Sequence, residues 1–125
     1  MAKVLISIGA NTHDKQSILQ RTIQAIGEIS HIIAQTPIFI SAAEGSTTAA
    51  PYANALIVAI TNDEYDTLRH TFKQWEINAG RTIELKRQGI IPLDIDIIMW
   101  NDTIIKERDM QMNYMKHGLQ LLDNH

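Results

Sequence analysis

Two aspartates separated by one residue are the side chains of this sequence best suited to chemistry. Asp94 and Asp96 lie in an apolar run that is typical of a buried β-strand. Residues two apart on a strand point to the same face and are separated by roughly 6.6 Å along the backbone. We therefore expect both carboxylates to share one face while Leu93, Ile95 and Ile97 face the core.

The shared face suggests a site for a divalent cation. Aspartate is a poor strand former, and like charges at this spacing repel each other. Mg²⁺ would remove the conflict, because it takes oxygen ligands and is commonly held by one or two carboxylates together with phosphates. The spacing alone leaves a second interpretation open, in which a solvated strand face tolerates two acids.

Other familiar catalytic patterns are absent from the sequence. It has neither a G-x-x-x-x-G-K-[ST] nor a G-x-G-x-x-G motif, and its five histidines show no zinc-binding spacing. The absence of cysteine excludes disulfides, thiolate metal sites and cysteine nucleophiles. The net charge of −3 gives no general attraction to nucleic acid or anionic lipid, so we expect neither as a partner.

Length and composition indicate one globular domain. The chain has 125 residues, of which 45% are hydrophobic and 20% charged, as is ordinary for a single core formed by residues 1–125. The apolar stretch near the N-terminus is too short for a signal peptide or a membrane span. The expected location is therefore the cytoplasm.

Hydrophobic patterning predicts the elements that must position the aspartates. Strands are expected over residues 4–8, 31–41, 52–61 and 93–100, with a short edge strand at 103–105. Helices are expected over residues 15–29, from 62–63 to about 80, and more weakly over 110–122. Asp14 is the expected N-cap of the first helix, and Asn62 and Asp63 cap the second. The connections 42–51 and 81–92 are read as loops.

The order of these elements predicts the fold class. The succession β-α-β-β-α-β is typical of a ferredoxin-like α+β sandwich, in which helices cover a mixed or antiparallel sheet. A doubly wound parallel sheet is disfavoured because no helix separates the second and third strands. The predicted edge strand could pair with a second copy or be covered, so the oligomeric state stays open.

Four segments in this order resemble the 6-hydroxymethyl-7,8-dihydropterin pyrophosphokinase family of folate biosynthesis. They are Ile-Gly-Ala-Asn at 8–11, Pro-Tyr-Ala-Asn-Ala at 51–55, Trp-Glu-Ile-Asn-Ala-Gly-Arg at 75–81 and Pro-Leu-Asp-Ile-Asp-Ile at 92–97. The resemblance implies the ferredoxin-like fold. It also implies transfer of the terminal diphosphate of ATP to the hydroxymethyl group of the pterin, with release of AMP.

The same resemblance implies roles for individual residues. Asp94 and Asp96 would hold two Mg²⁺ ions on the ATP phosphates, with Arg81 as a further catalytic group. The implied ATP-binding residues are Glu76, Lys73, Ile97, Arg108 and Tyr114. The implied pterin-binding residues are Ser41, Tyr52 and Asn54; an amide can both donate to and accept from the ring edge.

The sequence also departs from the family pattern. Ile83 and Ile91 stand where the family has basic residues, and Gln88 stands where a tryptophan would close over the pterin. Glu44 replaces an apolar contact, and the chain ends at His125, before the usual C-terminal segment. Fewer guanidinium donors near the phosphates predict an impaired reaction. Two alternatives therefore stay open: a nucleotide-binding relative with another small substrate, or a non-catalytic ferredoxin-like binding or assembly domain.

Overall fold

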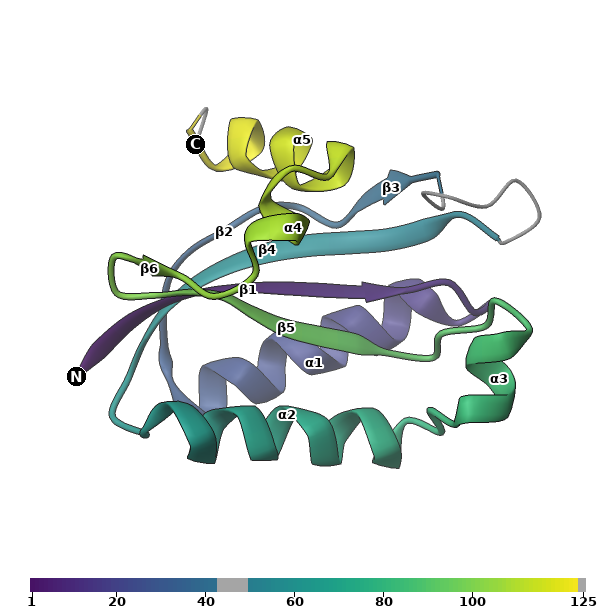
Figure 1. Cartoon of the computed structure of the whole chain (residues 1–125), viewed down its shortest axis with the longest axis horizontal. Coiled ribbons are helices and arrows are strands. Elements are labelled where there is room, and N and C mark those ends of the chain that lie inside the picture. Colours follow the sequence, from purple (N-terminus) through teal and green to yellow (C-terminus); the bar gives the residue numbers. More distant parts are fainter. Residues whose placement is uncertain (43–49, 124–125) are drawn as a thin grey trace.

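One antiparallel β-sheet carries all the strands of the computed structural model, which describes residues 1–42 and 50–123 (Figure 1). The strand order is β2-β4-β1-β5-β6, and β3 also pairs with β4. The strands are β1 (Ala2–Ala10), β2 (His31–Gln35), β3 (Phe39–Ser41), β4 (Tyr52–Thr61), β5 (Asp94–Trp100) and β6 (Thr103–Ile104). The helices are α1 (Lys15–Ile29), α2 (Tyr65–Asn78), α3 (Ile83–Arg87), α4 (Glu107–Met110) and α5 (Asn113–Asp123).

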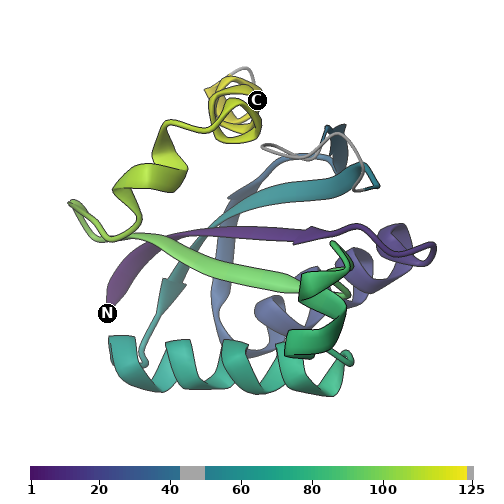
Figure 2. The same cartoon turned by 45° about the vertical axis from the view of Figure 1, so that its right-hand side comes forward.

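The sheet has a hydrophobic layer on each face. Helices α1 and α2 cover one face, and α5 lies across the other, as Figures 1 and 2 show. On the first face Ile6, Ile8 and Ile95 pack with Leu19 and Phe72 from the helices. Fully burying such a side chain stabilises the fold by roughly 1.5–3 kcal/mol. The predicted α+β, ferredoxin-like class is confirmed.

The smaller layer holds the C-terminal helix against the sheet. Leu5, Leu56 and Ile98 from β1, β4 and β5 pack with Met115 of α5. Gly118 allows the close approach, because a Cβ at this position would lie 2.6 Å from Cδ1 of Leu56. This contact fixes the position of the turn that precedes α5, which contributes to the site described below.

Three predicted boundaries were wrong. The expected strand 31–41 is two strands, β2 and β3, because Pro37 has no N–H to donate to the sheet. The expected loop 81–92 contains α3, whose N-cap Thr82 accepts a hydrogen bond from the Leu85 amide at 3.1 Å. The weak helical pattern at 110–122 corresponds to α5, which begins only at Asn113, and the short helix α4 ends at Met110.

The predicted helix caps also differ from the structure. Asp14 occupies the N-cap position of α1, but its carboxylate accepts from the Thr12 hydroxyl at 2.6 Å and makes no hydrogen bond to a helix amide. Glu64, rather than Asn62 or Asp63, is the N-cap of α2 and likewise makes no side-chain capping bond. No helix in the described part of the chain is long and apolar enough to cross a membrane.

Candidate active site

The two aspartates belong to a polar row that crosses the middle of the sheet. Asp94 lies opposite Gly9 of β1, and Gly9 lies opposite Asn54 of β4. Asp96 lies opposite Ser7 in the same way. The prediction that Leu93, Ile95 and Ile97 face the core is confirmed, since all three side chains are buried. Alternation along β5 therefore places both carboxylates on the face that α5 leaves partly open.

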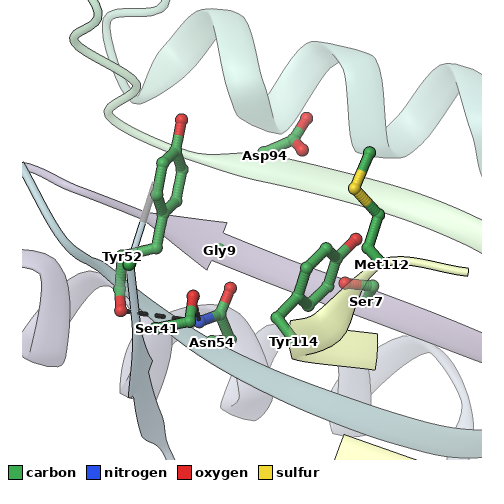
Figure 3. A pocket seen from close by; sticks show the side chains of 9 residues that line it. Ser7, Gly9, Ser41, Tyr52, Asn54, Asp94, Met112 and Tyr114 are labelled. Carbon is green, nitrogen blue, oxygen red and sulfur yellow. Dashed lines mark hydrogen bonds between the residues drawn. The ribbon is translucent and has the colours of Figure 1, made fainter. Parts of the chain in front are cut away.

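Beside Asp94 lies a cavity of about 190 Å³ (Figure 3). It is lined by Ser7, Gly9, Ser41, Ala42, Tyr52, Asn54, Asp94, Met112 and Tyr114. The three predicted pterin-binding residues are thus brought together, and Tyr114, which was predicted to bind ATP, joins them from the start of α5. Apart from Asp94, every described residue that lines this cavity is uncharged.

The floor of the cavity depends on Gly9 and Asn54. The Asn54 amide donates to the Ser41 hydroxyl at 2.7 Å, which fixes the orientation of its carboxamide. A Cβ on residue 9 would lie 3.3 Å from Oδ1 of Asn54 and 3.6 Å from the Tyr52 ring. Glycine therefore keeps the floor flat and leaves both polar groups in place.

The opposite wall is formed by Tyr114 and Ser7, which lie next to each other in Figure 3. Burial raises the pKa of Tyr114 to about 12, although its hydrogen bond with Ser7 acts in the opposite direction. The phenol consequently stays neutral and offers a hydroxyl to a ligand. Sequence reasoning missed Ser7; the available signal was a single hydroxyl within the otherwise apolar run 4–8.

A network of ion pairs links α2 to β5 behind the aspartates. Glu76 is buried, with 3% of its side chain exposed, and its Oε2 accepts the Ile95 amide at 2.8 Å. The same oxygen lies 3.1 Å from Nη1 of Arg81, and Oε1 lies 3.3 Å from Nζ of Lys73. Nη1 of Arg81 also donates to Oδ1 of Asp94 at 2.7 Å. Glu76 thus holds both the strand and the arginine in position.

Asp96 has weaker compensation for its charge than Asp94. The nearest cationic group among the described residues is Nζ of Lys106, at 4.0 Å. Burial, followed by the charge of Asp94 and a hydrogen bond with it, raises the pKa of Asp96 to about 7. Bringing these two carboxylates together is therefore unfavourable unless a cation or a proton neutralises them.

The donor set fits Mg²⁺ bound together with phosphates. No group of three or more His, Cys, Asp or Glu side chains in residues 1–42 and 50–123 is placed to hold an ion by itself. Two carboxylates are a common protein contribution to a Mg²⁺ site whose remaining ligands are water and phosphate oxygens. Asp94 and Asp96 are the residues that would hold it.

A second and smaller hollow, of about 50 Å³, lies beside Asp96. It is lined by Tyr65, Arg69, Phe72, Lys73, Ile95, Asp96, Ile97 and Lys106. Three of these side chains are cationic, whereas Asp94 is the one charged group among the described residues that line the first cavity. Lys73 and Ile97, both predicted to bind ATP, belong to this hollow. The aspartate pair therefore stands between an uncharged cavity and a basic one.

Some predicted features lie away from these cavities. Arg108 is exposed on α4 and lines neither of the two. Gln88 is also exposed and donates to Glu84 at 3.4 Å, within its own loop. Glu44 lies outside the described residues.

The 81–92 loop is attached to the sheet by Asn11, which sequence reasoning did not single out. Its side chain donates to the Gly89 carbonyl and accepts from the Ile91 amide, both at 2.7 Å. The backbone N–H of Asn11 donates in turn to the Ile91 carbonyl oxygen at 3.0 Å. One buried asparagine thus fixes the end of the loop that carries Arg81 at its start.

Comparison with known families agrees with the geometry of this site. The family model described as 7,8-dihydro-6-hydroxymethylpterin-pyrophosphokinase matches residues 5–123 of the 125-residue chain. The match includes β1 from Leu5 onward, both aspartates, the loop with Arg81, and α5. The chain belongs to the 7,8-dihydro-6-hydroxymethylpterin-pyrophosphokinase family.

Proposed function

We propose that this protein transfers the terminal diphosphate of ATP to the hydroxymethyl group of 6-hydroxymethyl-7,8-dihydropterin. The observation that carries the proposal is the position of Asp94 and Asp96 between two cavities of different character. An uncharged flat ring suits one cavity, and the cations that line the other suit the phosphates of a nucleotide bound beside it. The reacting groups would then meet at the carboxylates.

The uncharged cavity supports a flat heterocyclic acceptor. Tyr52 and Tyr114 supply aromatic surface, and Asn54 supplies an amide that can pair with ring nitrogen and oxygen atoms. Burial and the charge of Asp94 raise the pKa of Tyr52, so this phenol stays protonated as well. These residues bind and orient the acceptor without placing a charge against it.

The basic hollow supports the nucleotide. Arg69, Lys73 and Lys106 line it, and Arg81 forms an ion pair with Asp94. These cations can offset the charge of a polyphosphate, which two aspartates alone would repel. We assign Glu76 an indirect part in nucleotide binding, since it holds Lys73 and Arg81 by ion pairs.

Enzymes of this family use ATP with Mg²⁺, and we propose two ions held by Asp94 and Asp96. When bound, Mg²⁺ supplies charge neutralisation on the phosphates and orients them for in-line displacement. The residues of the chain must exclude water and hold the acceptor hydroxyl in line with the phosphorus.

The proposed reaction is a single displacement. The acceptor hydroxyl oxygen forms a bond to the β-phosphorus of ATP, and the bond from that phosphorus to the α,β-bridging oxygen breaks. AMP leaves with the bridging oxygen, and the hydroxyl proton is released to the medium. Positioning and electrostatic stabilisation account for most of the catalysis in reactions of this type.

We further propose that this protein turns over more slowly than is usual for its family. Two positions at which the family has basic residues carry isoleucine here, the exposed Ile83 and the buried Ile91. Because isoleucine has no charge, neither position contributes a cation to the phosphates. Removing one preorganised donor in comparable sites costs a factor of about 10²–10³ in rate. Arg81 remains as the guanidinium in contact with an aspartate.

The test is AMP formation from ATP and Mg²⁺, measured with and without the hydroxymethyl pterin. We expect AMP and the pterin diphosphate in equal amounts, and a loss of at least about 10²-fold in Asp94→Asn and in Asp96→Asn. Asp102→Asn, which alters an exposed turn, is the matched control and should retain the wild-type rate. Tight pterin binding without pterin-dependent AMP would instead favour a binding protein. AMP formation with a different acceptor would favour a relative with another substrate.

A further inference from the structure

The guanidinium of Arg81 occupies the place of a counter-ion on Asp94. Its Nη1 lies 2.7 Å from Oδ1 of Asp94, 3.1 Å from Oε2 of Glu76 and 3.5 Å from the Leu93 carbonyl oxygen. One nitrogen with two hydrogens cannot serve three acceptors equally well. Among the described residues, Arg81 is the cation paired with Asp94.

The two carboxylates that share Arg81 differ in how firmly they are fixed. Glu76 is buried, and its Oε2 is also bonded to the Ile95 amide in the backbone of β5. Asp94 is 37% exposed, and the cavity opens beside it. The bond to Asp94 is therefore the more easily exchanged of the two, while the bond to Glu76 acts as the pivot.

We infer, resting on the function proposed above, that Arg81 makes metal binding depend on the nucleotide. In the free protein the guanidinium neutralises Asp94, and Lys106 partly neutralises Asp96. A divalent cation then gains little from the pair, because it must displace a cation already present and is repelled by it. Metal alone binds weakly.

Nucleotide phosphates reverse this balance. Their oxygens match the fork of a guanidinium and accept two parallel hydrogen bonds, which Asp94 does not receive from Nη1 alone. Arg81 turns from Asp94 to a phosphate about its contact with Glu76, and Asp94 becomes free to bind the ion that arrives with the nucleotide. Glu76 is in this respect a positioning residue for Arg81.

The experiment measures Mn²⁺ affinity without nucleotide, from the electron paramagnetic resonance signal of free Mn²⁺, at about pH 8 so that Asp96 is ionised. Arg81→Gln should bind Mn²⁺ about tenfold more tightly than wild type, because the competing cation is gone. Arg81→Lys, which keeps a charge but loses the fork, should fall between the two. The Arg81→Lys variant also serves as a second test of the inference if Arg81→Gln folds poorly. Circular dichroism reports on the folding of each variant.

Arg87→Gln is the matched control. Arg87 ends α3 in the same 81–92 segment, so the substitution removes the same charge without removing a contact with Asp94. It should change Mn²⁺ affinity by less than about twofold, since the charge is exposed and screened. An equal gain in Arg87→Gln would overturn the inference, because general charge would then explain the effect.

Adding a non-hydrolysable ATP analogue separates this inference from the proposed function. In wild type the analogue should tighten Mn²⁺ binding strongly, and Arg81→Gln should lose most of that gain. Wild type that binds Mn²⁺ and the analogue together, with Mn²⁺-alone affinity unchanged or weaker in Arg81→Gln, overturns the inference and leaves the proposed function standing. Wild type that binds no analogue overturns both.

Discussion

The shifted pKa of Asp96 predicts that this carboxylate weakens the fold above neutral pH when no cation is bound. The perturbation is Asp96→Asn, which keeps the size of the side chain and removes its charge. Burial and the neighbouring Asp94 raise the pKa of Asp96 from 3.8 to about 7 in the native protein. The side chain is 17% exposed, so solvent screens the effect only in part.

The sign and size follow from proton linkage. The native state binds the Asp96 proton more tightly than the unfolded state, so this group stabilises the fold most below about pH 4. That contribution falls as the pH rises toward 7. Between about pH 5 and pH 8 the linkage relation gives a loss of about 2.5 kcal/mol in the free energy of unfolding. Asp96→Asn lacks this loss and should become the more stable protein at about pH 8.

The assay is urea unfolding of both proteins across this pH range, at low ionic strength and with a metal chelator present. The quantity compared is the difference between wild type and Asp96→Asn, which cancels other titrating groups. Asp102→Asn in the exposed turn between β5 and β6 should follow wild type. If the difference between wild type and Asp96→Asn changed by less than about 0.5 kcal/mol from pH 5 to pH 8, the electrostatic reasoning would be refuted.

Four further substitutions test the elements that position the site. Gly118→Val should destabilise the protein by about 2 kcal/mol in urea unfolding, since α5 is pressed against Leu56; equal stability would contradict the tight packing. Asn11→Ala should cost about 2 kcal/mol and speed amide hydrogen exchange at residues 89–91, and unchanged exchange would show that the loop has another anchor. Ile91→Arg should destabilise by about 3 kcal/mol, because this side chain is 7% exposed; Ile83→Arg, at a position 73% exposed, should stay within about 0.5 kcal/mol of wild type. Equal thermal stability of these two arginine variants would contradict the expectation that the buried position tolerates a charge less well than the exposed one.

The strands were predicted well where polar and apolar side chains alternate strictly along the sequence. Asp94 and Asp96 alternate with buried isoleucines, and this alternation fixes which face the carboxylates share. The pattern does not extend through the strand, because the pairing of β5 with β1 shifts between Leu5 and Ile6. Such a bulge depends on the partner strand, so the alternation of residues along a single strand does not reveal it.

Local signals failed where a second partner competed for the same group. Asp14 has the residue type and the position of an N-cap, yet the hydroxyl of Thr12 binds its carboxylate. Pro37 did mark a strand break that the apolar pattern around it obscured. Thr82 was a capping signal within a segment read as a loop.

The parts of the site assembled over long sequence distances were the least predictable. Ser7 and Tyr114 meet at one wall of the first cavity, and Asn11 reaches the loop around residue 90. Nothing in the local sequence around Asn11 specifies that its partners lie about eighty residues away. Resemblance to a family supplied Tyr114, whereas the bonding role of Asn11 required the folded chain.

The placement of the diphosphate transfer at Asp94 and Asp96 is tested most directly by a crystal structure with Mg²⁺, a non-hydrolysable ATP analogue and the hydroxymethyl pterin. We expect the pterin ring in the cavity between Tyr52, Asn54 and Tyr114, with its hydroxymethyl group directed toward Asp94. We expect the β-phosphate beside Asp94 and Asp96, with metal ions bridging the carboxylates to the phosphates. A nucleotide bound away from the two aspartates, or an ordered ternary complex without an ion between carboxylates and phosphates, would contradict it.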